Sequence, residues 1–248
     1  MTSCKSGGLS DVKDFPPIFK PNFPTVNVAV IGDSQTAGDY GARLAKRVRE
    51  DSKQRLLYFG SASSARIHHW IDGGFSAIPS SFFRSCESPA EFNCNPILTP
   101  GKKTRSLNSI LSLFPEIDGY IVTLGDNHYY DPGSVRAYTK EITKLLISSG
   151  KRSAFVTPTL ALGYFSNKDK IVDGIKQGLQ DVEAEYDSTC TLIDSYSLGD
   201  DVIKTINDKK VIENSVKNDS MKLHPAGDGA HLWADRVFEK LLQDNFLD

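Results

Sequence analysis

The sequence predicts an α/β fold in which a parallel sheet is covered by helices on both faces. Short runs rich in β-branched and other apolar residues recur along the chain after residue 24. Longer segments with apolar residues at helical spacing separate these runs. Polar turns that contain glycine follow the first three of the runs. This alternation is typical of parallel strands joined by crossover helices.

The first strand and helix of this pattern are the clearest. Residues 26–31 form a valine-rich run that ends at Gly32, and apolar residues then recur at helical spacing up to Val48, with basic residues on the outer side. Further strands are expected at 55–59, 120–124, 154–157 and 191–194. Helices are expected near 106–113, 133–149, 168–185 and 225–244.

The chain of 248 residues is long enough for one well-filled domain, whereas two domains would each have a thin core. We therefore expect a single domain over residues 25–248. Residues 1–24 carry several prolines among polar residues, which indicates an extended tether. Residues 61–105 are rich in serine, proline and glycine and show no clear periodicity, so we expect a long loop insertion that forms a wall or lid of a functional site.

The charges are nearly balanced, with 29 Lys plus Arg against 31 Asp plus Glu and a net charge of −2. Such a balance gives no long-range attraction to nucleic acid or to an anionic membrane. The sequence also lacks an apolar run long enough to span a bilayer. We expect a monomer that acts on a small or neutral molecule and does not bind nucleic acid.

The cysteines give information about the cellular compartment in which the protein is found. Cys4 follows small residues in a segment that resembles the end of a bacterial lipoprotein signal, which predicts a lipid anchor there and an extracytoplasmic location. The alternative is a chance match of four residues. Cys86 and Cys94 bracket a short loop and are expected either to form a disulfide or to stay as two thiols. Cys190 begins an apolar run and is expected to be buried.

Polar clusters follow the first three predicted strands, at residues 32–38, 60–64 and 125–128. In an open α/β sheet, ligands bind beyond the carboxyl ends of the strands, where helix N-termini present free N–H groups. Each cluster alone is explained by a turn or a helix cap. Three at successive strand ends predict a functional site.

The segment before the last predicted helix offers a general base. It contains Asp219, His224, Asp228 and His231 within a short stretch. A serine hydroxyl is a weak nucleophile at neutral pH, so it needs an adjacent imidazole, and a carboxylate can hold that imidazole in the correct tautomer.

Taken together, these segments resemble the SGNH/GDSL hydrolase family. Gly32-Asp33-Ser34 matches the first family block, Gly60 matches the glycine after the second strand, and Gly125-Asp126-Asn127 matches the asparagine block. The resemblance implies a three-layer α/β/α, flavodoxin-like, doubly wound sheet of about five strands. It also implies that Ser34 is the nucleophile of an ester hydrolase and that no metal or cofactor is needed. The oxyanion hole would consist of the N–H groups of Ser34 and Gly60 and the side chain of Asn127.

The sequence departs from the family pattern in two places. His128 stands where an aspartate usually follows the asparagine. In the last block the downstream helix register favours His224 as the base, with Asp219 as its carboxylate, although the usual spacing of three residues is absent. His231 with Asp228 has that spacing and is the alternative, as is a serine–histidine dyad.

The expected reaction is two-step acyl transfer through Ser34, removing short acyl groups, acetyl above all, from a carbohydrate or cell-envelope ester. Ile67, Trp70 and Phe75 lie in the long loop and could stack on a sugar ring, although Trp70 could equally fill the core. An O-acyltransferase with the same residues is one alternative. A noncatalytic carbohydrate-binding module on the same fold is the other.

Overall fold

The computed structural model describes residues 26–76, 83–89, 92–99, 101–128, 130–159, 167–188, 190–202 and 224–248. The predicted tether, including Cys4, and the predicted carboxylate Asp219 lie outside these ranges. The described chain folds around one sheet of seven strands in the order β4-β3-β2-β1-β5-β6-β7. Within it, no helix has the length and apolarity that crossing a bilayer requires.

The parallel part of the sheet confirms the five predicted strands. These are β1 (Val26–Gly32), β2 (Gln54–Ala62), β5 (Gly119–Thr123), β6 (Arg152–Val156) and β7 (Thr191–Ile193). They pair in parallel in the order β2-β1-β5-β6-β7, which is the flavodoxin-like order. The order reverses at β1, so the turn after β1 lies at the switch point where open α/β sheets bind ligands.

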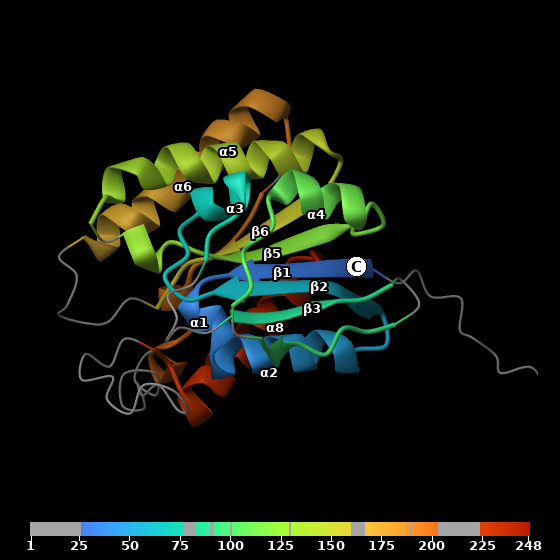
Figure 1. The fold of residues 1–248 in the computed structure, drawn as a ribbon. Helices are drawn as coiled ribbons and strands as arrows, with labels where there is room; N and C mark the ends of the chain where they lie inside the picture. The colour runs from blue at the N-terminus through green and yellow to red at the C-terminus, as the bar shows by residue number, and fades with distance from the viewer. Residues whose placement is uncertain are drawn as a thin grey trace, which may run out of the picture.

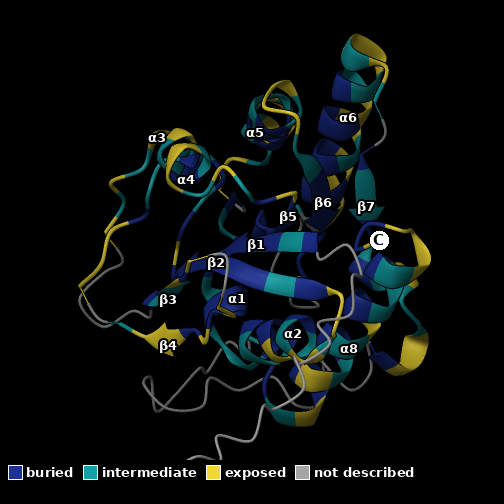
Figure 2. Cartoon of the chain, turned by 90° about the vertical axis from the view of Figure 1, so that its right-hand side faces the viewer, coloured by how far each residue is buried: buried dark blue, intermediate teal, exposed yellow. Residues whose placement is uncertain are grey.

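Helices cover both faces of the sheet (Figure 1). One face carries α3 (His68–Asp72), α4 (Leu107–Leu113), α5 (Val135–Ser148) and α6 (Lys168–Tyr186), and the other carries α2 (Asp39–Glu50) and α8 (Gly227–Gln243). Figure 2 shows that buried residues gather in the central strands and on the inward sides of the helices. On the α2 and α8 face, Tyr40 stacks on Trp233 at 3.6 Å between ring centroids.

Residues 61–105, where a long loop insertion is expected, contain regular structure. Besides α3, this interval contains β3 (Phe83–Glu87) and β4 (Ile97–Leu98), which extend the sheet beyond β2 in antiparallel fashion. A disulfide joins Cys86 to Cys94. Of the two alternatives expected from the sequence, a disulfide or two free thiols, the structure contains the disulfide. Period-two burial is present in β3, where Phe83 and Ser85 are buried, but the strand is too short and polar for its sequence to reveal this.

Two glycines allow the elements after β1 to pack closely. The chain passes from β1 into α1 (Ser34–Ala37) and directly on into α2. A Cβ atom on Gly41 would lie 1.8 Å from the carbonyl oxygen of Thr36, and one on Gly32 would lie 2.1 Å from Thr36 Oγ1. Since real Cβ atoms cannot approach so closely, glycine at both positions permits the tight turn that presents Ser34.

Replacement of Gly41 by alanine should therefore lower the free energy of unfolding by about 2 kcal/mol or more, because the methyl group meets backbone that cannot move aside cheaply. Urea unfolding measures the change. Gly133→Ala is the control, because a Cβ atom there would have its nearest neighbour at 4.0 Å. Equal stabilities of the two variants would contradict this account of the turn.

Candidate active site

Ser34 lies at the start of α1, immediately after β1. Asp33 caps the helix, because its Oδ1 accepts a hydrogen bond of 3.0 Å from the N–H of Gln35. Asp33 is fully buried, and this burial, with the nearby Asp126, raises the pKa of its carboxyl well above the usual range. The side chain of Ser34 is partly exposed, and its N–H belongs to the first turn of the helix, where no intrahelical acceptor exists.

An imidazole lies against the serine. The Nε2 atom of His224 is 2.7 Å from the Oγ atom of Ser34, although 190 residues separate them along the chain. The segment that carries His224 is fixed to α2, because the N–H of Gly227 donates to Oδ2 of Asp39 at 2.9 Å. His231 is exposed within α8. Of the two histidines considered from the sequence, His224 is the one that the structure brings to Ser34.

The carboxylate partner of this imidazole stays a prediction. Asp219 lies outside the described residues, so its position relative to His224 is not part of the described structure. Asp228 lies in the first turn of α8 with an exposed side chain. A carboxylate at a helix N-terminus also interacts favourably with the helix dipole, which is sufficient reason for an aspartate at position 228.

Asn127 joins the ends of two strands. It lies in the single 3-10 turn Asp126–His128 after β5, and its Nδ2 donates a hydrogen bond of 3.0 Å to the carbonyl oxygen of Ala65, which follows β2. A side-chain amide nitrogen carries two hydrogens, so one remains for a further acceptor. Its side chain is partly exposed, as a group that meets a ligand must be.

The predicted place of Gly60 after the second strand is wrong. Strand β2 continues to Ala62, and Gly60 lies inside the sheet in register with Ile31 of β1 and Ser85 of β3. A Cβ atom at Gly60 would lie 2.7 Å from the ring of Trp70, so the glycine makes room for this ring. The turn that follows β2 contains Ser64 with φ of 62°, a conformation rarely adopted by a residue other than glycine.

The aromatic residues considered for sugar stacking do not offer an open face. Trp70, in α3, and Ile67, which caps this helix, are fully buried in the core. Phe75 is more exposed, but its ring stacks on His69 at 3.9 Å between centroids. Trp70 therefore fills the core, which was the second of the two interpretations of the sequence.

His128 has a structural role. It is fully buried, its Nε2 accepts a hydrogen bond of 3.1 Å from the N–H of Ile67, and its Nδ1 lies 3.2 Å from Oγ of Ser134. Since that hydroxyl donates to the carbonyl oxygen of Asp131, it accepts from Nδ1–H, which assigns the neutral tautomer. Burial, with a smaller effect of Arg66, lowers the pKa of His128 to about 4.

Metal ligation has no support in the described chain, where no group of three or more His, Cys, Asp or Glu side chains could hold an ion. The rings of His68, His69 and His128 lie near one another. Both ring nitrogens of His128 are already used, and Nδ1 of His69 accepts a hydrogen bond from the N–H of Arg66.

Solved structures share this architecture at low sequence identity. A member of the lipolytic G-D-S-L family from Veillonella parvula superposes with a TM-score of 0.55 and 14% identity, covering 88% of this chain and 100% of that one. The chain has the fold of the GDSL-type hydrolases. A peptidoglycan O-acetylesterase has the same fold, with a TM-score of 0.54, 10% identity and coverage of 88% and 91%. An acetyl xylan esterase also has it, with a TM-score of 0.51, 13% identity and coverage of 87% and 100%.

No family model matches the sequence, and no curated protein matches it either. At such low identities the shared GDSL-type fold does not carry a function with it. The function has to be argued from the geometry around Ser34.

The buried, neutral ring of His128 predicts that the stability of the protein depends on pH. A histidine whose folded pKa is lowered to about 4 favours folding fully above its unfolded pKa of about 6.5, and this contribution is lost as the pH falls from about 6.5 to about 4. In His128→Gln the slope of unfolding free energy against pH in this window should decrease by up to about 1.4 kcal/mol per pH unit.

Urea unfolding of the variant at pH 4.5, 5.25 and 6 tests this prediction. A slope remains in the variant, because burial also lowers the pKa of His69 to about 4. His231→Gln, on the exposed side of α8, is the control and should keep the slope of the parent protein. An unchanged slope in His128→Gln would contradict the structural role of the neutral His128 ring.

Proposed function

We propose that the protein is a serine ester hydrolase in which Ser34 is the nucleophile and His224 the general base. The observation that carries the proposal is the 2.7 Å contact between His224 Nε2 and Ser34 Oγ at the switch point of the sheet. This is the distance at which an imidazole takes the proton of a hydroxyl. The side chains of Ser34 and His224 are both partly exposed, so a substrate can reach them from solvent.

The reaction proceeds in two steps. Ser34 Oγ attacks the ester carbonyl while His224 Nε2 accepts its proton, and the protonated imidazole then donates to the leaving alcohol. Water, activated by the neutral imidazole, hydrolyses the acyl-enzyme. The oxyanion is held by the N–H of Ser34 and the free amide hydrogen of Asn127.

The substrate is an ester of a short acyl group, acetyl above all, on a carbohydrate or another cell-envelope molecule. Supporting this choice, proteins of the same fold include a peptidoglycan O-acetylesterase and an acetyl xylan esterase. The disulfide between Cys86 and Cys94 favours an oxidising compartment, and an extracytoplasmic enzyme anchored at Cys4 is part of the proposal.

The central test compares Ser34→Ala and His224→Ala with the parent protein on 4-nitrophenyl acetate. Each variant should lose about a thousandfold or more in kcat/KM, because the nucleophile and its base act as a unit. His231→Ala is the matched control and should stay within about twofold of the parent, since its side chain is exposed on α8. Parent-like turnover in His224→Ala would overturn the assignment of the base.

Asn127→Ala should lower kcat by about a hundredfold to a thousandfold and change KM little, because a donor to the oxyanion acts mainly in the transition state. The same kinetics measured on Asn108→Ala, a change on the exposed side of α4, should match the parent. An increase of KM at unchanged kcat would instead make Asn127 a residue that only positions the turn through Ala65.

A further inference from the structure

Arg66 follows Ala65, the residue that binds the proposed oxyanion donor Asn127. Its backbone is fixed at the start of α3, since its N–H donates to Nδ1 of His69 and its carbonyl oxygen accepts from the N–H of the same residue. The side chain is only partly exposed. Within the ranges that the structure describes, its guanidinium forms no ion pair and no hydrogen bond.

The position of Arg66 follows from Asn127. The carbonyl oxygen of Ala65, the residue before Arg66, accepts the hydrogen bond from Asn127 Nδ2. Arg66 therefore leaves the backbone one residue from a direct contact of the proposed oxyanion donor. In an ester bound at Ser34, groups on either side of the carbonyl lie near this turn.

The surroundings of Arg66 do not neutralise its charge. Burial lowers the pKa of His69 and of His128 to about 4, with smaller effects of Arg66 and of His68, so both rings are neutral at physiological pH. Asp72 and Asp131 act on the same cluster of histidines, but neither forms an ion pair with Arg66. A permanently charged guanidinium that is partly exposed and has no partner among the described residues can bind an anionic ligand.

A groove lies beyond α3, and its lining carries the basic residues Lys102, Lys103 and Arg105 and the acidic residues Asp72 and Glu87, of which Arg105 and Glu87 form an ion pair. It has a volume of about 530 Å³ and is lined from Phe83 to Glu87 along β3 and by the segment after α3. Phe83 pairs with Ala62, the last residue of β2, so one end of the groove lies at the edge of the sheet that carries Ser34. Lys102 and Lys103 lie exposed on its rim without ion pairs in the described chain.

The helix α3 connects the two features. Arg66 precedes its first residue, whereas Asp72 at its end lines the groove. Since α3 has five residues, about 7.5 Å separates its ends. A sugar residue next to the one at Ser34 can span such a distance, so a single chain can contact both Arg66 and the groove.

We propose that the substrate carries a carboxylate next to the scissile ester, that Arg66 binds this carboxylate, and that the groove with Lys102 and Lys103 holds the rest of an acidic glycan. The guanidinium is suited to the task because it forms two parallel hydrogen bonds to a carboxylate. This inference rests on the proposed function. It adds that the acylated sugar is an acidic one, such as a uronate.

The test uses acetylated polygalacturonate and the same polymer with its carboxylates methyl-esterified, with acetate release as the readout. The parent should prefer the acidic polymer by about tenfold or more in kcat/KM, and the preference should shrink at 0.5 M salt, about a 4 Å screening length. Arg66→Gln should abolish the preference mainly through KM, and Arg66→Lys should restore part of it.

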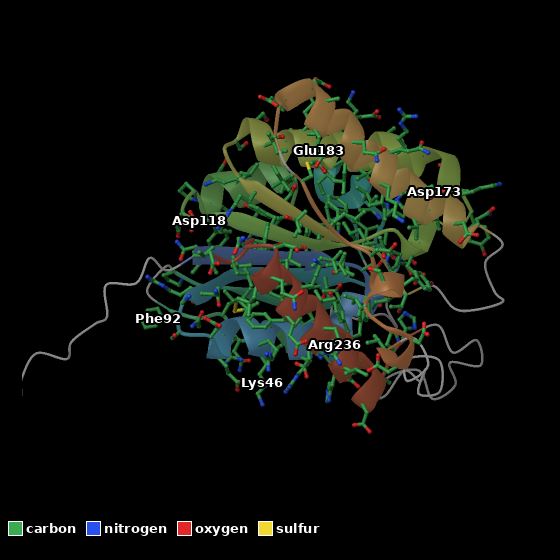
Figure 3. All side chains as sticks on the ribbon, turned by 180° about the vertical axis from the view of Figure 1, so that it is seen from behind. Lys46, Phe92, Asp118, Asp173, Glu183 and Arg236 are labelled. Carbon is green, nitrogen blue, oxygen red and sulfur yellow. A yellow bond between two sulfur atoms is a disulfide. The ribbon has the colours of Figure 1, made fainter. Side chains whose placement is uncertain are left out.

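Two controls separate this inference from the proposed function. Hydrolysis of neutral 4-nitrophenyl acetate should be unchanged in Arg66→Gln, and its absence in the parent would overturn the proposed function instead. Lys46→Gln removes the same charge from the far surface of α2, where Figure 3 shows Lys46 pointing outward, and should keep the preference.

Two further measurements locate the carboxylate. If Arg66→Gln is impaired on 4-nitrophenyl hemisuccinate and not on the acidic polymer, the carboxylate belongs to the acyl group and the glycan part of the proposal is wrong. A double Lys102→Ser, Lys103→Ser variant should lose activity on the acidic polymer but not on O-acetyl galacturonic acid. The whole proposal is overturned if the parent does not distinguish charged from neutral substrates, or if Arg66→Gln behaves like the parent on all of them.

Discussion

The close packing after β1 is the constraint on which the rest of the site depends. Gly32 and Gly41 both lie against Thr36, so the chain turns from strand to helix within a few residues. The turn exposes Ser34 at the carboxyl edge of the sheet while Asp33 is buried beneath it as the helix cap. The order of the sheet also reverses at this edge. His224, which lies just before α8, contacts Ser34 at the same point. A looser turn would separate Ser34 from that imidazole.

The second support of the site is the uncharged histidine His128, which stands where the pattern that the sequence resembles has an aspartate. His128 accepts the N–H of Ile67 with one nitrogen and donates to Ser134 with the other, so a buried imidazole satisfies both of its polar atoms. It thereby holds α3 against the end of β5, and Asn127 adds a second link through Ala65. The imidazole is uncharged at physiological pH, because burial lowers its pKa to about 4.

The sequence was sufficient where a pattern was long and regular. Strand β1 and the helix α8 follow from valine alternation and helical spacing, and the register of α8 pointed to His224, the histidine that the structure places against Ser34. Short elements were missed, because β4 has two residues and β3 has five, of which only Phe83 and Cys86 are apolar. Gly60 was misplaced because Gly60 and Ser61, residue types that are typical of turns, belong to the strand, which continues to Ala62. Tertiary pairing decided these cases, and pairing across the sheet leaves no local signal.

Labelling of the protein with a fluorophosphonate, followed by peptide mass spectrometry, tests the central claim most directly, since such probes react with a serine that an imidazole has activated. The account predicts a single adduct on Ser34, formed rapidly in the parent protein and at least about a hundredfold more slowly in His224→Ala. An adduct on another residue, or ester hydrolysis that persists with Ser34 unlabelled, would contradict it.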